Sequence, residues 1–164
     1  MRAVVAAATL ALFAPLVTPA AAWAKGRTAR VTLTCEGLSG PVEITDTTVL
    51  AFRYGPWSGG FLDSTRGPVA RPREGLRVCE VAFYVAFGDR TTRLAYVLYY
   101  CYDRVAAARQ GFVYLPGEGS PWYALNVATI DRFTRGGRWQ MAARPWEDVI
   151  RQAIARADRL QQGS

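Results

Sequence analysis

Acidic and aromatic side chains gather in the glycine- and proline-rich segments of this chain, where a ligand could be bound or cut. The acids are Asp63, Glu118 and Asp131. Two carboxyl groups cleave a glycosidic bond when they flank it about 5 Å or about 6.5–9.5 Å apart. Rigid aromatic faces with a polar handle suit stacking on sugars or gripping a protein partner. The aromatic residues in or beside these segments are Tyr54, Trp57, Trp122, Tyr123 and Trp139.

From this pattern we predict a ligand-binding site formed by Trp57, Glu118, Trp122 and Tyr123. The alternative is that each tryptophan fills the core from the loop side and that the acids are only solvated. We predict no catalytic residue, no metal ligand and no cofactor. The chain contains no histidine, which excludes the Ser-His-Asp triad, the Cys-His pair and His-ligated zinc.

The first residues predict export. Arg2 is followed by an apolar run over residues 3–17 and by small residues up to Ala24, the layout of a secretory signal peptide. An uncleaved anchor is the alternative, although the run is short and contains Pro15. We therefore expect a signal peptide over residues 1–24, a single domain over residues 25–164, and no transmembrane segment after cleavage.

Positive charge also bears on the partner. The formal net charge is +7, and arginine supplies nearly all of it because Lys25 is the only lysine. In an extracytoplasmic protein, such a surface meets anionic envelope polymers or lipid headgroups rather than nucleic acid. The densest arginine group lies over residues 66–77, and a solvated loop explains it as well as a binding patch does.

Three cysteines in an oxidising compartment predict one disulfide. A hairpin that turns about Arg90 places Cys79 opposite Cys101, which makes them the candidate pair. A four-residue loop over residues 88–91 instead places Cys79 opposite Tyr100 and turns Cys101 to the other face. A bridge from Cys35 to either of the other cysteines, and no bridge at all, remain open.

Hydrophobic periodicity predicts an α+β fold, with an antiparallel sheet of about five to seven strands and one C-terminal amphipathic helix on one face. The helix is expected over about 145–161, with Pro145 in its first turn. Strands are expected over residues 30–35, 42–44, 76–87, 93–103, 111–115, 123–130 and 138–142, with a helix or strand over 47–54 and an irregular excursion over 55–75.

The segment over residues 111–130, GFVYLPGEGSPWYALNVATI, and the earlier stretch Pro56-Trp57-Ser58-Gly59 carry a resemblance. Together they resemble a group of exported bacterial proteins of unassigned function, over most of residues 30–155. The resemblance implies export but no activity, cofactor or site residue.

We therefore expect a secreted or envelope-facing domain that binds an envelope glycan, an anionic polymer or a protein. The alternatives are an envelope enzyme that acts on a glycan through paired carboxylates, and a structural role within an envelope assembly.

Overall fold

In the computed structural model, the described residues are 26–50, 59–88, 91–106, 108–129 and 136–163. The signal peptide expected over residues 1–24 lies outside them, so it stays a prediction. Within the described part of the chain, no helix is both long and apolar enough to cross a membrane.

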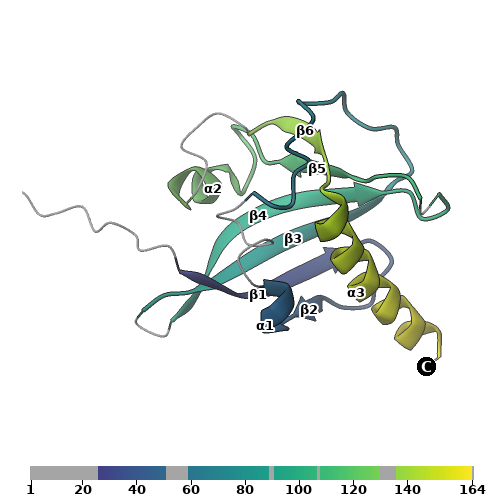
Figure 1. The fold of residues 1–164 in the computed structure, drawn as a ribbon, viewed down its shortest axis with the longest axis horizontal. Coiled ribbons are helices and arrows are strands. Elements are labelled where there is room, and N and C mark those ends of the chain that lie inside the picture. The colour runs from purple at the N-terminus through teal and green to yellow at the C-terminus, as the bar shows by residue number, and fades with distance from the viewer. Residues whose placement is uncertain (1–25, 51–58, 89–90, 107, 130–135, 164) are drawn as a thin grey trace, which may run out of the picture.

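One antiparallel sheet of six strands forms the body of the molecule (Figure 1). The strands follow the order β2-β1-β3-β4-β5-β6, so the two longest strands, β3 and β4, lie at the centre. This confirms the predicted α+β class and the antiparallel sheet. The elements are β1 Arg27–Cys35, β2 Val42–Ile44, α1 Thr47–Leu50, β3 Arg77–Ala86, β4 Thr92–Tyr102, β5 Phe112–Leu115, α2 Tyr123–Thr129, β6 Arg138–Met141 and α3 Arg144–Gln162.

The C-terminal helix α3 lies across one face of the sheet and buries its apolar stripe there (Figure 1). Trp146, Ile150 and Ile154 are each no more than 2% exposed. They join Phe83 and Tyr96 in a single hydrophobic core. The helix begins and ends within one residue of the predicted bounds, because its 3.6-residue periodicity and Pro145 mark it clearly.

Strand register decides the disulfide, and it shows that the predicted Cys79–Cys101 pair is wrong. Cys79 lies opposite Tyr100 on β4, so Cys101 faces the other side of the sheet. A register shift between Phe83 and Tyr84 produces this alignment, because the pairs nearer the hairpin are offset from it by one residue. On its other side, β3 pairs with β1, and there Cys79 lies directly opposite Cys35. The disulfide therefore joins Cys35 to Cys79, and Cys101 is a buried free thiol.

The strand expected over residues 123–130 is wrong, because most of that segment forms the helix α2. The N–H of Asn126 donates to the Trp122 carbonyl in the helical pattern. The Asn126 side chain is 1% exposed and pairs with β4, accepting from the Val97 N–H at 2.9 Å and donating to the Val97 carbonyl at 2.7 Å. One side-chain amide thus supplies both hydrogen bonds that a neighbouring strand would give to Val97.

The segment after α1 is anchored to the sheet where it is described. The ring of Phe61 is 3% exposed and packs against Phe83, Tyr96 and Trp146. Farther along, the N–H of Val69 donates to the Trp139 carbonyl, so the backbone runs beside the outer edge of β6. Backbone pairing and one aromatic anchor therefore hold this irregular excursion in place.

Candidate functional site: an aromatic row on the open face of the sheet

The face of the sheet opposite α3 carries a transverse row of large side chains. Residues directly opposite one another on neighbouring strands share a face. The register pairs Glu80 with Tyr99, Tyr99 with Tyr114, and Tyr114 with Trp139. We call Tyr99, Tyr114 and Trp139 the aromatic row; it crosses β4, β5 and β6 and ends beside Glu80 on β3.

The rings of the aromatic row touch one another and remain partly exposed. The ring centroids of Tyr99 and Tyr114 are 6.4 Å apart, and those of Tyr114 and Trp139 are 4.9 Å apart. Such cross-strand pairs each stabilise a sheet by about 0.2–1 kcal/mol. The row therefore holds the short strands β5 and β6 together and offers a preformed apolar surface to a ligand.

A polar group closes one end of the aromatic row. The indole N–H of Trp122, just before α2, donates to Glu80 Oε2 at 2.9 Å. Burial, and next the negative charge of Glu80, raise the pKa of Tyr99 above its ordinary value. The Tyr99 phenol therefore stays protonated at neutral pH. This end combines aromatic surface, a carboxylate acceptor and a hydroxyl group.

Of the four predicted site residues, the structure places Trp122 at the aromatic row. Glu118 is exposed on the tip that precedes α2, where within the described chain it neither hydrogen-bonds nor ion-pairs with Trp122 or Tyr123. Tyr123 lies partly exposed near Gly136 at the turn into β6. Trp57 lies outside the described residues. The predicted cluster therefore stays untested as a whole, and only Trp122 belongs to the surface described above.

Of the two other candidate acids, Asp63 lies within the described residues. Asp63 accepts hydrogen bonds from the hydroxyl and the N–H of Thr65 and from the Gln110 amide, and the Thr65 hydroxyl and next Gln110 lower its pKa most. Asp63 therefore closes a local turn as an ionised group. Asp131 lies outside the described residues.

The sequence reasoning missed Glu80, Tyr99 and Tyr114. Apolar and aromatic residues fill both faces of β3 and β4, so the alternation that separates the two faces is weak there. Tyr99 and Tyr100 illustrate this, since Tyr99 is partly exposed on the face opposite α3 and Tyr100 is fully buried in the core. Only the residues opposite Tyr99 and Tyr100 on the neighbouring strands would distinguish the two faces, and those residues depend on the register.

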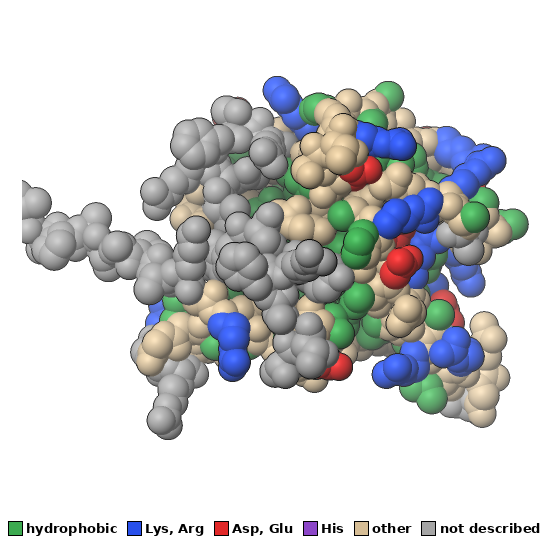
Figure 2. All heavy atoms as spheres, viewed as in Figure 1, with side chains coloured by type: hydrophobic (Ala, Val, Ile, Leu, Met, Phe, Trp, Pro, Cys, Tyr) green, Lys and Arg blue, Asp and Glu red, His purple; other side chains and the backbone are tan. Residues whose placement is uncertain are grey.

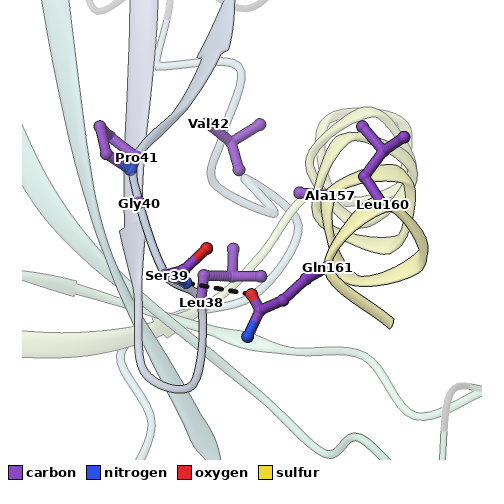
Figure 3. A pocket seen from close by; sticks show the side chains of 8 residues that line it. All are labelled: Leu38, Ser39, Gly40, Pro41, Val42, Ala157, Leu160 and Gln161. Atoms are coloured by element: carbon purple, nitrogen blue, oxygen red, sulfur yellow. Dashed lines mark hydrogen bonds between the residues drawn. The ribbon is translucent and has the colours of Figure 1, made fainter. Parts of the chain in front are cut away.

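An apolar groove of about 310 Å³ lies between the β1–β2 connection and the last turns of α3 (Figure 3). Leu38, Val42, Ala157 and Leu160 line it, and Gln161 bridges it by accepting the Ser39 N–H at 3.0 Å. No titratable side chain lines this groove. The groove therefore separates α3 from the β1–β2 connection and offers no group for acid or base chemistry.

A charged cavity of about 280 Å³ lies between α3 and the ends of β3 and β4, lined among others by Arg77, Asp103 and Asp158. Arg77 is almost fully buried and donates to both Asp158 oxygens, at 2.7 and 3.1 Å. Hydrogen bonding from Arg77 lowers the pKa of Asp158. The N–H groups of Ala106 and Val105 lower the pKa of Asp103. Both carboxyl groups in this cavity are therefore ionised at neutral pH.

Beside this cavity, Glu147 is fully buried at the start of α3. Its Oε1 accepts from the Tyr100 hydroxyl at 2.7 Å, the Gly111 N–H at 2.6 Å and the Arg151 guanidinium at 2.6 Å. A Cβ at position 111 would lie 2.6 Å from this oxygen, so only glycine fits there. The network fastens α3 to β4 and β5, and its complete burial gives it a structural role.

Fold and site together define a class: an α+β domain with one face covered by α3 and an aromatic row that is partly exposed on the other face. No family model, curated protein or solved structure matches the chain. Among the described residues, no group of three or more His, Cys, Asp or Glu side chains is placed to hold a metal ion.

Proposed function

We propose that this protein is an extracytoplasmic, non-catalytic binding domain that holds a glycan of the cell envelope against the aromatic row. One observation carries the proposal: Tyr99, Tyr114 and Trp139 form a preformed, partly exposed surface across three strands, and the Trp122–Glu80 pair lies at its end. Aromatic faces beside a polar group are the arrangement that suits a sugar ring, with its apolar C–H face and its hydroxyl rim.

The dimensions of the row support a chain-like ligand. Neighbouring strands lie about 4.8 Å apart, so the three strands present aromatic surface along about 10 Å. Glu80 is the natural acceptor for sugar hydroxyl groups at one end, since a carboxylate accepts several hydrogen bonds and Trp122 occupies one of them. The strands fix the surface in advance, which lowers the entropy cost of binding.

The Cys35–Cys79 disulfide is compatible with an extracytoplasmic location. The signal-peptide pattern over residues 1–24 supports the same location. In this proposal, export places the aromatic row where envelope glycans are available.

The second candidate, a glycan-cleaving enzyme, needs one carboxyl group that stays protonated to donate to the leaving group. Asp103 and Asp158 line one cavity, but the contacts of each lower its pKa. This pair therefore does not supply the acid. Binding is the function that the geometry favours.

Calorimetric titration of the mature domain with soluble glycan fragments tests the proposal. The panel consists of β-1,4-linked N-acetylglucosamine oligomers and muramidase-released peptidoglycan fragments. We expect at least one to bind, and Trp139→Ala and Tyr114→Ala each to weaken binding about tenfold, equivalent to about 1.4 kcal/mol. Tyr84→Ala is the matched control, because Tyr84 is a partly exposed tyrosine on the same face beside Arg30.

Failure of the whole panel to bind, or equal affinity of the wild type and the row variants, would overturn the proposal. Circular dichroism and the unfolding midpoint of each variant establish that its fold is intact.

A further inference from the structure

A second surface lies at the tip of the loop between β4 and β5, where an apolar side chain points into solvent. Val105 is 96% exposed, the most exposed of the large hydrophobic side chains in the described part of the chain. Figure 1 shows this loop at the outer end of the sheet, opposite to the end where β1 begins. In Figure 2, hydrophobic side chains at this end have Lys or Arg side chains on either side.

The loop is held in this position by several hydrogen bonds. Asp103 Oδ1 accepts the N–H of Val105 at 3.0 Å and that of Ala106 at 3.1 Å. On the other arm, α3 holds two carbonyls: Arg144 donates to Ala108 at 2.6 Å and Arg151 donates to Arg109 at 2.8 Å. Val105 is therefore exposed on a loop whose backbone is fixed by hydrogen bonds.

Arginines surround this apolar tip. Arg104 is exposed next to Val105, and the side chains of Arg73 and Arg109 are 67% and 68% exposed. Arg73 and Arg109 share one carboxylate, Asp103, at 2.5 and 3.9 Å. With Arg104 included, the immediate surroundings of the tip carry an excess of positive charge.

We propose that the β4–β5 loop docks this protein on an anionic phospholipid surface. Val105 enters the boundary between headgroups and acyl chains, while Arg104, Arg109 and Arg73 bind lipid phosphates. An apolar residue within a cationic rim is the pattern of an interfacial membrane contact. Each arginine near an anionic surface strengthens binding about fivefold, so the contact is reversible and sensitive to salt.

The apolar tip is what favours a membrane over a soluble polyanion. A soluble polyanion would engage the arginines alone and would have no use for Val105. The inference does not depend on glycan binding, because the aromatic row and the loop tip share no residue. A domain that binds at both surfaces would hold a glycan close to the membrane.

Sedimentation with lipid vesicles tests this inference, using the mature domain. The vesicles contain phosphatidylcholine with phosphatidylglycerol, or phosphatidylcholine alone. We expect binding to the anionic vesicles only, and its loss in high salt. Val105→Asp, and Arg104→Gln combined with Arg109→Gln, should each weaken binding at least about tenfold, whereas Val105→Trp should strengthen it.

Leu160→Asp is the matched control, since Leu160 is 70% exposed on α3. It should bind anionic vesicles like the wild type. Near-ultraviolet circular dichroism shows whether each variant is folded. The inference is overturned if the wild type does not bind anionic vesicles, or if Val105→Asp binds them equally well. Inorganic polyphosphate is added as a competitor. If polyphosphate displaces all of the protein from the vesicles, and if Val105→Asp binds polyphosphate as well as the wild type does, the partner is a soluble polyanion instead.

Discussion

Trp122 and Glu80 are joined by a hydrogen bond of 2.9 Å between the indole N–H and the carboxylate, across 42 residues of sequence. The bond links the loop before α2 to the central strand β3. It places an aromatic ring and a negative charge at one end of the row formed by Tyr99, Tyr114 and Trp139. The Trp122–Glu80 pair thus defines one end of the proposed binding site.

Trp122→Phe keeps most of the ring but removes its N–H donor. We expect the unfolding free energy to fall by about 1–2 kcal/mol, because a hydrogen bond to a charged acceptor is lost in a partly buried place. Glycan affinity should fall several-fold, since the Glu80 carboxylate is no longer held. Urea denaturation and calorimetry measure the two effects, with Tyr123→Phe as the neighbouring control. Unchanged stability and affinity in Trp122→Phe would show that the pair does not organise the site.

Asn126→Ala tests whether one side-chain amide really substitutes for a strand. It leaves the N–H and the carbonyl of Val97 without their partners inside the protein. We expect a loss of about 2–4 kcal/mol in the unfolding free energy, since each buried polar group left unpaired costs about 1–3 kcal/mol. Hydrogen exchange should show a much faster Val97 amide. Wild-type protection of that amide in the variant would contradict this role.

The sequence identified the elements whose patterns are strong and local. The helix over 145–161 and the central strands β3 and β4 carry long apolar patterns, and they form as expected. The strand expected over residues 123–130 failed because seven residues with Tyr and Val fit a short helix equally well. The strand assignment gave no role to Asn126, whose side chain is buried and bonds the backbone of Val97.

The disulfide and the aromatic row depend on register, which is not local. Cys35 reaches Cys79 because β1 pairs with β3, across a separation of 44 residues. Cys79 lies opposite Tyr100 rather than Cys101, and this alignment depends on a register shift between Phe83 and Tyr84, inside the strands rather than in the hairpin loop. The same register brings Tyr99, Tyr114 and Trp139 into one row. Sequence reasoning therefore found Trp122 but not its partner Glu80.

The cysteine assignment predicts a simple mass result. The chain unfolded without reductant should take up one alkyl group, at Cys101, and the reduced chain should take up three. Burial raises the pKa of Cys101 to about 11, so the folded protein should resist alkylation at neutral pH. A peptide that links Cys101 to another cysteine would contradict the structure.

Removing the bridge should also destabilise the fold. Cys35→Ala combined with Cys79→Ala should lower the unfolding free energy by about 4 kcal/mol, the chain-entropy value for a loop of this size. Cys101→Ala is the control and keeps the bridge. Equal stability of the bridged and unbridged proteins would show that the disulfide contributes nothing.

Acid should weaken the contact between α3 and the sheet. Hydrogen bonding from Arg77 lowers the pKa of Asp158 from its ordinary value of 3.8. A carboxyl group whose pKa is lower in the folded chain stabilises the fold above its unfolded-state pKa. That contribution is lost as the pH falls through the folded-state pKa. The contribution of Asp158 should therefore be complete near neutral pH and decline below about pH 4.

Asp158→Asn should lower the unfolding free energy by about 2–3 kcal/mol at neutral pH, because it leaves Arg77 buried without its counter-charge. The loss is smaller than for a fully buried pair, because the Asp158 side chain is 25% exposed. The variant should also lose less stability than the wild type between neutral pH and pH 3. Denaturant titrations across this range measure both effects. Glu43→Gln, which breaks an exposed pair with Arg30, is the control and should change stability by less than about 1 kcal/mol. Parallel acid profiles for the wild type and Asp158→Asn would contradict the assignment.

The most direct test of glycan binding at the aromatic row is to observe the indole N–H resonances of the mature domain by nuclear magnetic resonance during titration with a bound glycan fragment. Trp139 and Trp122 lie at the proposed site, whereas Trp146 is 1% exposed in the core on the other face and serves as an internal reference. The proposal predicts saturable shifts of the Trp139 and Trp122 resonances and a stationary Trp146 resonance. Stationary Trp139 and Trp122 resonances at saturating ligand would contradict it.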